Sequence, residues 1–123
     1  MRAFKLVERE VSAEVREILV EGELDLAVAE QLQEALDRAG SDCTQILVGL
    51  ESCEFIDSTG IAVIVQAHRD FAEEGRRVVL CAPRSQVLRV LSVTGLTANG
   101  LVFESAAEAL SASTLSSALD GQR

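Results

Sequence analysis

The sequence predicts an α/β fold with a mixed sheet of four to five strands and about four helices. Two extended segments open the chain, and helical and extended segments then alternate to its end. Helical crossovers force the strands that they join to run parallel, with right-handed connections. Apolar residues make up 48% of the 123 residues and are spread throughout. This composition predicts a globular core, and the length fits a single domain over residues 1–123.

The first two strands are expected at 4–10 and 15–21, where a short polar turn between them favours an antiparallel pair. The Gly-Glu-Leu-Asp segment at 22–25 is expected to break the second strand. Asp25 is placed to cap the first helix, and Gly40 to end it. The apolar residues of that helix recur at helical spacing: Ala29, Leu32, Ala35, Leu36 and Ala39.

The continuous apolar run at 46–50 is typical of a strand that is buried on both faces. A loop is expected at 51–56, and a second helix from about 58 to Gly75, with Val63 and Ala67 on its exposed side. The buried stripe of this helix is expected to contain Ile61, Ile64, Val65, His68 and Ala72.

The remainder of the chain repeats the alternation of strand and helix. A strand is expected at 78–81, and Pro83 opens a third helix that ends near Gly95. The apolar residues expected on that helix are Val87, Leu88, Val90 and Leu91. A short strand at 101–103 is expected to complete the sheet.

The C-terminal part begins with a Ser-x-x-Glu sequence, Ser105 to Glu108, which has the form of a capping box. It predicts a last helix from about residue 106 towards Leu119. The core of the domain is therefore expected at 4–110, with a C-terminal helix and tail at 105–123.

The charge balance argues against two classes of partner. The chain has 20 acidic and 11 basic side chains, a formal net charge of -9. Such a surface repels nucleic acid and anionic lipid, and four Phe without Trp or Tyr offer little for base stacking. No apolar run approaches the roughly 18 residues of a membrane span, and the start lacks the pattern of a signal peptide. We therefore expect a cytoplasmic protein that binds neither nucleic acid nor membrane.

Few residues in the sequence could support catalysis. Cys43, Cys53 and Cys81 stand apart beside apolar neighbours, which indicates buried reduced thiols and too few ligands for a metal site. His68, the single histidine, is about ten residues beyond Ser58 on one helix, or about 15 Å, too far to activate that serine. The chain also lacks a phosphate-binding loop. We expect no enzyme, no catalytic residue, no cofactor and no metal.

Polar residues collect where sites form in open α/β sheets, after the carboxyl ends of the strands. Glu23 and Asp25 follow the second strand, and Asp57, Ser58 and Thr59 follow the third. The latter three begin a helix, where several backbone N–H groups lack partners. From the residues alone, Asp57 or Ser58 is a helix cap, or this edge of the sheet is a binding site.

The stretch Leu50-Glu51-Ser52-Cys53-Glu54-Phe55-Ile56-Asp57-Ser58-Thr59-Gly60-Ile61 resembles the signature of the STAS domain. More narrowly, it resembles the bacterial anti-sigma factor antagonists, whose hallmark is an Asp-Ser-Ser/Thr-Gly tetrad after a buried strand. The segments 22–25 and 87–96 agree in order and spacing, so the resemblance extends over about 4–110.

The resemblance implies a partner switch. The unphosphorylated protein binds an anti-sigma factor, which is a serine kinase, and thereby releases a sigma factor. Phosphorylation at the position of Ser58 ends the binding, and a phosphatase reverses the modification. The surroundings of this site are expected to be Glu23, Asp25, Asp57, Thr59 and Gly60.

Three alternatives remain open at this point. Thr59 is a second possible acceptor. The chain is alternatively a STAS scaffold or regulatory subunit of a larger signalling assembly that is not linked to a sigma factor. A third interpretation is a nucleotide-binding or nucleotide-hydrolysing domain that uses the acidic residues and a divalent metal. An antagonist is expected to be a monomer or weak dimer.

Overall fold

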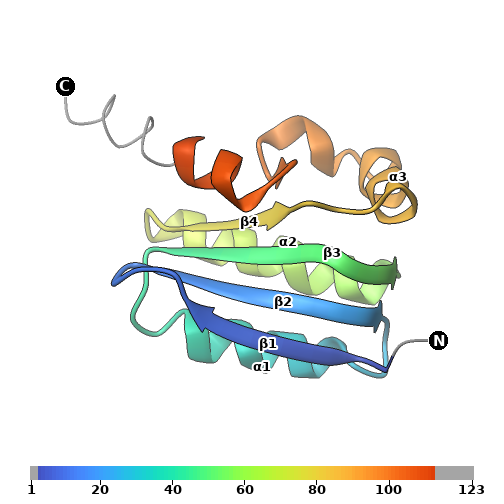
Figure 1. The fold of residues 1–123 in the computed structure, drawn as a ribbon, viewed down its shortest axis with the longest axis horizontal. Helices are drawn as coiled ribbons and strands as arrows, with labels where there is room; N and C mark the ends of the chain where they lie inside the picture. The colour runs from blue at the N-terminus through green and yellow to red at the C-terminus, as the bar shows by residue number, and fades with distance from the viewer. Residues whose placement is uncertain (1–2, 113–123) are drawn as a thin grey trace.

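The computed structural model describes residues 3–112, apart from the side chains at 98 and 99, and confirms the expected α/β architecture (Figure 1). Five strands form one sheet in the order β1-β2-β3-β4-β5. The strands are β1 (Lys5–Glu10), β2 (Val15–Leu24), β3 (Gln45–Ile56), β4 (Arg77–Cys81) and β5 (Val102–Phe103). The pair β1 and β2 is antiparallel, and every later pair is parallel. The sheet is therefore mixed, as the sequence predicted.

Helices connect the parallel strands and cover one face of the sheet (Figure 1). They are α1 (Ala29–Ala39), α2 (Ser58–Glu73), α3 (Ser85–Val93) and the short 3-10 helix η1 (Leu96–Asn99). A further helix begins at 106 and is described to 112. The Ser105 hydroxyl accepts a hydrogen bond from the Glu108 amide at 3.1 Å, which confirms the predicted cap. The expected continuation towards Leu119 lies outside the described residues.

The main core lies between the sheet and its helices. Its largest fully buried side chains include Ile18, Leu24, Leu32, Leu36, Ile46, Leu50, Ile64, Leu80 and Leu91. A smaller cluster forms on the opposite face, where Ala109 of the last helix packs with Leu47, Val79 and Cys81. All five residues expected on the apolar stripe of α1 are buried.

Both strands that lead to the site are longer than expected. The sequence predicted a break at 22–25 and a loop at 51–56, but β2 continues to Leu24 and β3 to Ile56. The added parts pair with each other, with register shifts between Leu19 and Glu21 and between Gly22 and Glu23. These irregularities interrupt the period-2 pattern, so the sequence did not reveal the pairing.

The buried face of α2 also differs from the prediction. Ala67, expected on the exposed side, is buried, whereas Ala72 is exposed and His68 half-buried. The buried side of α2 contains Gly60, Ile64, Ala67 and Phe71. This helix packs against α1 as well as the sheet, so residues between the two contacts are buried too.

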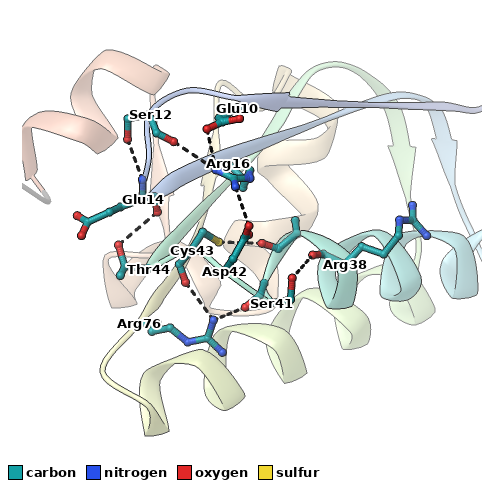
Figure 2. A network of polar contacts seen from close by, with 12 residues as sticks. Glu10, Ser12, Glu14, Arg16, Arg38, Ser41, Asp42, Cys43, Thr44 and Arg76 are labelled. Carbon is teal, nitrogen blue, oxygen red and sulfur yellow. Dashed lines mark hydrogen bonds and ion pairs between the residues drawn. The ribbon is translucent and has the colours of Figure 1, made fainter.

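An arginine network fixes the end of the sheet that is remote from Ser58 (Figure 2). Arg16 donates to the Asp42 carboxylate at 3.1 Å and to the Ser12 carbonyl at 3.2 Å. Arg76 donates to the backbone carbonyls of Gly40 and Cys43. These contacts join the β1–β2 turn and the start of β4 to the connection between α1 and β3.

Candidate functional site

Asp57 forms the N-terminal cap of α2, directly after β3. Its backbone is extended, and its Oδ1 accepts hydrogen bonds from the amides of Thr59 at 2.9 Å and Gly60 at 3.1 Å. The Thr59 hydroxyl donates to the same oxygen. The capping interpretation therefore holds for Asp57, which satisfies two amides that a helix start leaves without intrahelical partners.

Asp57 also joins the ends of two neighbouring strands. Its amide donates to the carbonyl of Leu24 at 3.1 Å, and its Oδ2 accepts from the amide of Leu26 at 3.2 Å. One carboxylate thus holds both the start of α2 and the connection from β2 to α1. The hydrogen bond from the Thr59 hydroxyl, followed by those from the backbone amides, lowers the pKa of Asp57. The group is an ionised acceptor at neutral pH.

Ser58 is the first residue of α2 and its side chain is exposed. The Ser58 hydroxyl makes no hydrogen bond to any residue between 3 and 112. Asp57 already caps the helix, so Ser58 has no capping function here. Thr59, in contrast, is half-buried and donates its hydroxyl to Asp57. Of the two adjacent hydroxyls, that of Ser58 is the accessible one.

Gly60 lets the start of α2 approach β2. A Cβ at Gly60 would lie 2.7 Å from Leu24 Cγ and 3.0 Å from the Leu24 carbonyl oxygen. Any side chain there would push the helix away from the sheet. Gly60 therefore has a packing role: it allows the start of α2, with Ser58, to lie directly against β2.

Glu23 and Asp25 lie on the neighbouring strand end. Glu23 is half-buried in β2, where it is in register with Phe55 of β3. Asp25 follows β2 but does not cap α1, whose first residue is preceded by Val28 without a side-chain cap. Its carboxylate instead accepts from the Ala27 amide at 3.1 Å, and so fixes the turn before the helix. Glu23 and Asp25 thus lie at the end of β2, next to the end of β3 that leads to Asp57.

Two exposed apolar residues at this edge were not identified from the sequence. Leu26 is 73% exposed, and its amide contacts Asp57. Phe55 is 47% exposed and precedes Asp57 by two positions. Phe55 was assigned to a loop. Leu26 offered one signal: it is an apolar residue between Asp25 and the first buried residue of α1, outside the helical stripe.

The remaining candidates lie away from Ser58 or inside the core. His68 Nδ1 lies 3.0 Å from the Val78 carbonyl and joins α2 to β4. Cys43, Cys53 and Cys81 are buried free thiols, as expected. Burial raises the pKa of each, and that of Cys81 to about 12.

The described part of the chain contains neither a cluster of metal-ligating side chains nor a helix that could span a membrane. Within residues 3–112, no three His, Cys, Asp or Glu side chains gather in a way that could hold a metal ion. The helices of this part are too short or too polar to cross a membrane.

The chain is similar to known proteins along most of its length. The STAS domain family model matches residues 7–109. The anti-sigma-B factor antagonist of Staphylococcus aureus is 30% identical over 81 residues, 65% of this chain and 75% of the relative. The anti-sigma factor antagonist SpoIIAA in its unphosphorylated form is 27% identical with a TM-score of 0.72, over 88% of this chain and 93% of that one.

The Bacillus cell fate determinant SpoIIAA in its phosphorylated form is also similar. It is 26% identical with a TM-score of 0.67, over 89% of this chain and 97% of that one. The sequence match and the structural match thus point to the same family. The sequence match, at residues 7–109, includes the ends of β2 and β3 and the start of α2. The chain belongs to the STAS domain family, and its relatives include the anti-sigma factor antagonists.

Proposed function

We propose that this chain is an anti-sigma factor antagonist and that Ser58 is its phosphorylation switch. Unphosphorylated, it binds an anti-sigma factor that is a serine kinase, and a sigma factor is released. The main support comes from the start of α2, where Asp57 caps the helix while the neighbouring Ser58 is left exposed. The similarity to antagonists, one of them in a phosphorylated form, supports the same conclusion.

A phosphate on Ser58 would stay exposed at this edge. It adds about 1.5 to 2 negative charges at neutral pH. A helix N-terminus favours an anion by only about 0.3–1 kcal/mol, and here the amides of Thr59 and Gly60 already bind Asp57. Glu23, Asp25 and Asp57 oppose the added charge. The phosphate therefore changes the binding surface without refolding the chain.

The release of the partner follows from this exposed charge. A phosphate of that size and charge disturbs the fit of a surface that has formed around a neutral hydroxyl. Each loss of about 1.4 kcal/mol weakens binding tenfold, so a few kcal/mol suffice for a switch. The kinase and the phosphatase are separate chains, and this chain acts by binding, without a catalytic residue of its own.

The test is transfer of phosphate to the purified chain. The chain is incubated with ATP, Mg²⁺ and the serine-kinase anti-sigma factor of its own organism, and the modified residue is mapped by mass spectrometry. We expect phosphate on Ser58, none on the S58A variant, and full modification at Ser58 in the T59V variant. Modification of Thr59 in the wild type, or an unmodified chain, would contradict the proposal. The latter result would favour a constitutive STAS scaffold.

A further inference from the structure

Large apolar side chains are exposed at five places in the described residues: Val11, Leu26, Phe55, Leu88 and Val93. Two of these five, Leu26 and Phe55, lie at the edge of the sheet that carries Ser58. Leu26 is tied to Asp57 by its amide, and Phe55 precedes Asp57 on β3. Exposed apolar groups beside a polar site are a common mark of a protein interface.

The backbone around Leu26 is rigidly held. The amides of Val28 and Ala29 both donate to the Asp25 carbonyl, at 3.1 and 2.9 Å. The amide of Ala27 donates to the Asp25 carboxylate, and that of Leu26 to Asp57 at 3.2 Å. Each amide from 26 to 29 is therefore hydrogen-bonded, while the Leu26 side chain remains 73% exposed. Because this backbone is already fixed, burial of the side chain by a partner costs little further backbone entropy.

Phe55 is fixed in a different way, as part of the sheet. It lies in β3, in register with Glu23 of β2, and its ring is 47% exposed. Aromatic residues contribute strongly to interfaces because they bury a large area with few rotatable bonds. Leu26 and Phe55 thus offer two preorganised apolar groups at the strand ends that lead to α1 and α2.

The charged residues near Leu26 and Phe55 indicate which kind of partner could bind there. Carboxylates neighbour both apolar residues: Glu23 is in register with Phe55, Asp25 precedes Leu26, and Asp57 accepts the Leu26 amide. The chain as a whole has a formal net charge of -9. A second copy of this chain would place the same carboxylates against each other in an isologous contact. A partner with an apolar patch bordered by Lys or Arg complements both features.

We infer that Leu26 and Phe55 are the apolar anchors by which this chain binds its anti-sigma factor, and that the factor presents an apolar patch bordered by basic side chains. The inference rests on the proposed function and adds residues that determine affinity. The anchors bury apolar area and contribute mainly to the lifetime of the complex, whereas the acidic rim contributes mainly to its rate of formation.

The test compares L26S and F55S with V93S, which changes an 82% exposed apolar residue at the far end of α3. Affinity for the anti-sigma factor is measured by calorimetry, and phosphorylation by steady-state kinetics. We expect L26S and F55S each to weaken binding about tenfold or more. They should raise KM for phosphorylation with little change in kcat, while V93S behaves as the wild type. Circular dichroism checks that each variant is folded.

The outcomes separate the inference from the proposed function. If S58D loses binding but L26S and F55S bind as tightly as V93S, the anchors are wrong and the switch remains. If the wild type neither binds the factor nor accepts phosphate, both proposals fail. A wild-type dimer in light scattering that L26S dissociates would also contradict the inference, because the occupant would then be a second copy.

Discussion

Gly60 of α2 lies so close to Leu24 of β2 that no side chain fits between them. A Cβ at Gly60 would be 2.7 Å from Leu24 Cγ and 3.0 Å from the Leu24 carbonyl oxygen. Leu24 is fully buried, and its carbonyl accepts the amide of Asp57. Gly60 thus belongs to the packing that positions the start of α2, where Ser58 lies.

The G60A variant should be less stable than the wild type. The added methyl overlaps Leu24, and overpacking of this kind costs about 1–3 kcal/mol of unfolding free energy. Urea denaturation measures the loss. In the L24A background, which lacks the obstructing Leu24 Cγ, the cost of G60A should be smaller. An equal cost in both backgrounds would contradict the steric explanation.

The contribution of Asp57 to stability should depend on pH. Its hydrogen bonds lower the pKa of the folded state below that of the unfolded chain. The stabilisation is therefore complete above the unfolded pKa of about 3.9, and it is lost as the pH falls through the folded value. In the D57N variant the side-chain oxygen can still accept from the amides of Thr59 and Gly60. The NH₂ group that replaces Oδ2 cannot accept the hydrogen bond from the Leu26 amide.

We expect D57N to have a lower urea midpoint than the wild type at about pH 7, and the difference to shrink at about pH 3. D37N is the matched control, because it removes one exposed carboxylate of α1, which accepts a hydrogen bond from Gln33. A D57N deficit that is equal at both values of pH would show that the charge of Asp57 is not the cause.

Arg76 should not be replaceable by lysine. Its guanidinium donates to the carbonyls of Gly40 and Cys43 (Figure 2). It also lies 4.1 Å from the ring centroid of Phe71. Lysine keeps the charge but lacks the planar group that makes these contacts together. We expect R76K to lose roughly 1–2 kcal/mol of unfolding free energy. R69K, on the exposed face of α2, should lose little, and equal losses would contradict the assigned contacts.

The three cysteines should be unreactive in the folded protein. Cys43, Cys53 and Cys81 are buried, and burial raises the pKa of the Cys81 thiol to about 12. At about pH 8 few thiolates form, and access is blocked. Ellman's reagent should therefore titrate almost no thiol in buffer and all three in denaturant. Rapid reaction of one thiol in buffer would show that the fold opens at that residue.

The sequence predicted the order of strands and helices well because each element carries a local signal. The apolar run of β3, the stripe of α1 and the Ser105 cap all depend on residues a few positions apart. The same holds for the proposed switch site, since Asp57, Ser58, Thr59 and Gly60 are contiguous. These signals could be read directly because they depend on neighbouring residues alone.

Contacts between distant segments could not be read in this way. The ends of β2 and β3 were assigned as a break and a loop, because polar residues such as Glu51 and Glu54 interrupt the apolar pattern. Their pairing is visible only when both strands are placed side by side. Leu26 was missed for the same reason, since its link to Asp57 joins residues 31 positions apart.

The most direct test of the switch is the affinity of the chain for its serine-kinase anti-sigma factor, measured by calorimetry before and after phosphorylation of Ser58. We expect the phosphorylated chain and S58D to bind at least about a hundredfold more weakly than the wild type and S58A. If all four forms bind with the same affinity, Ser58 is not the switch, and the central claim is contradicted.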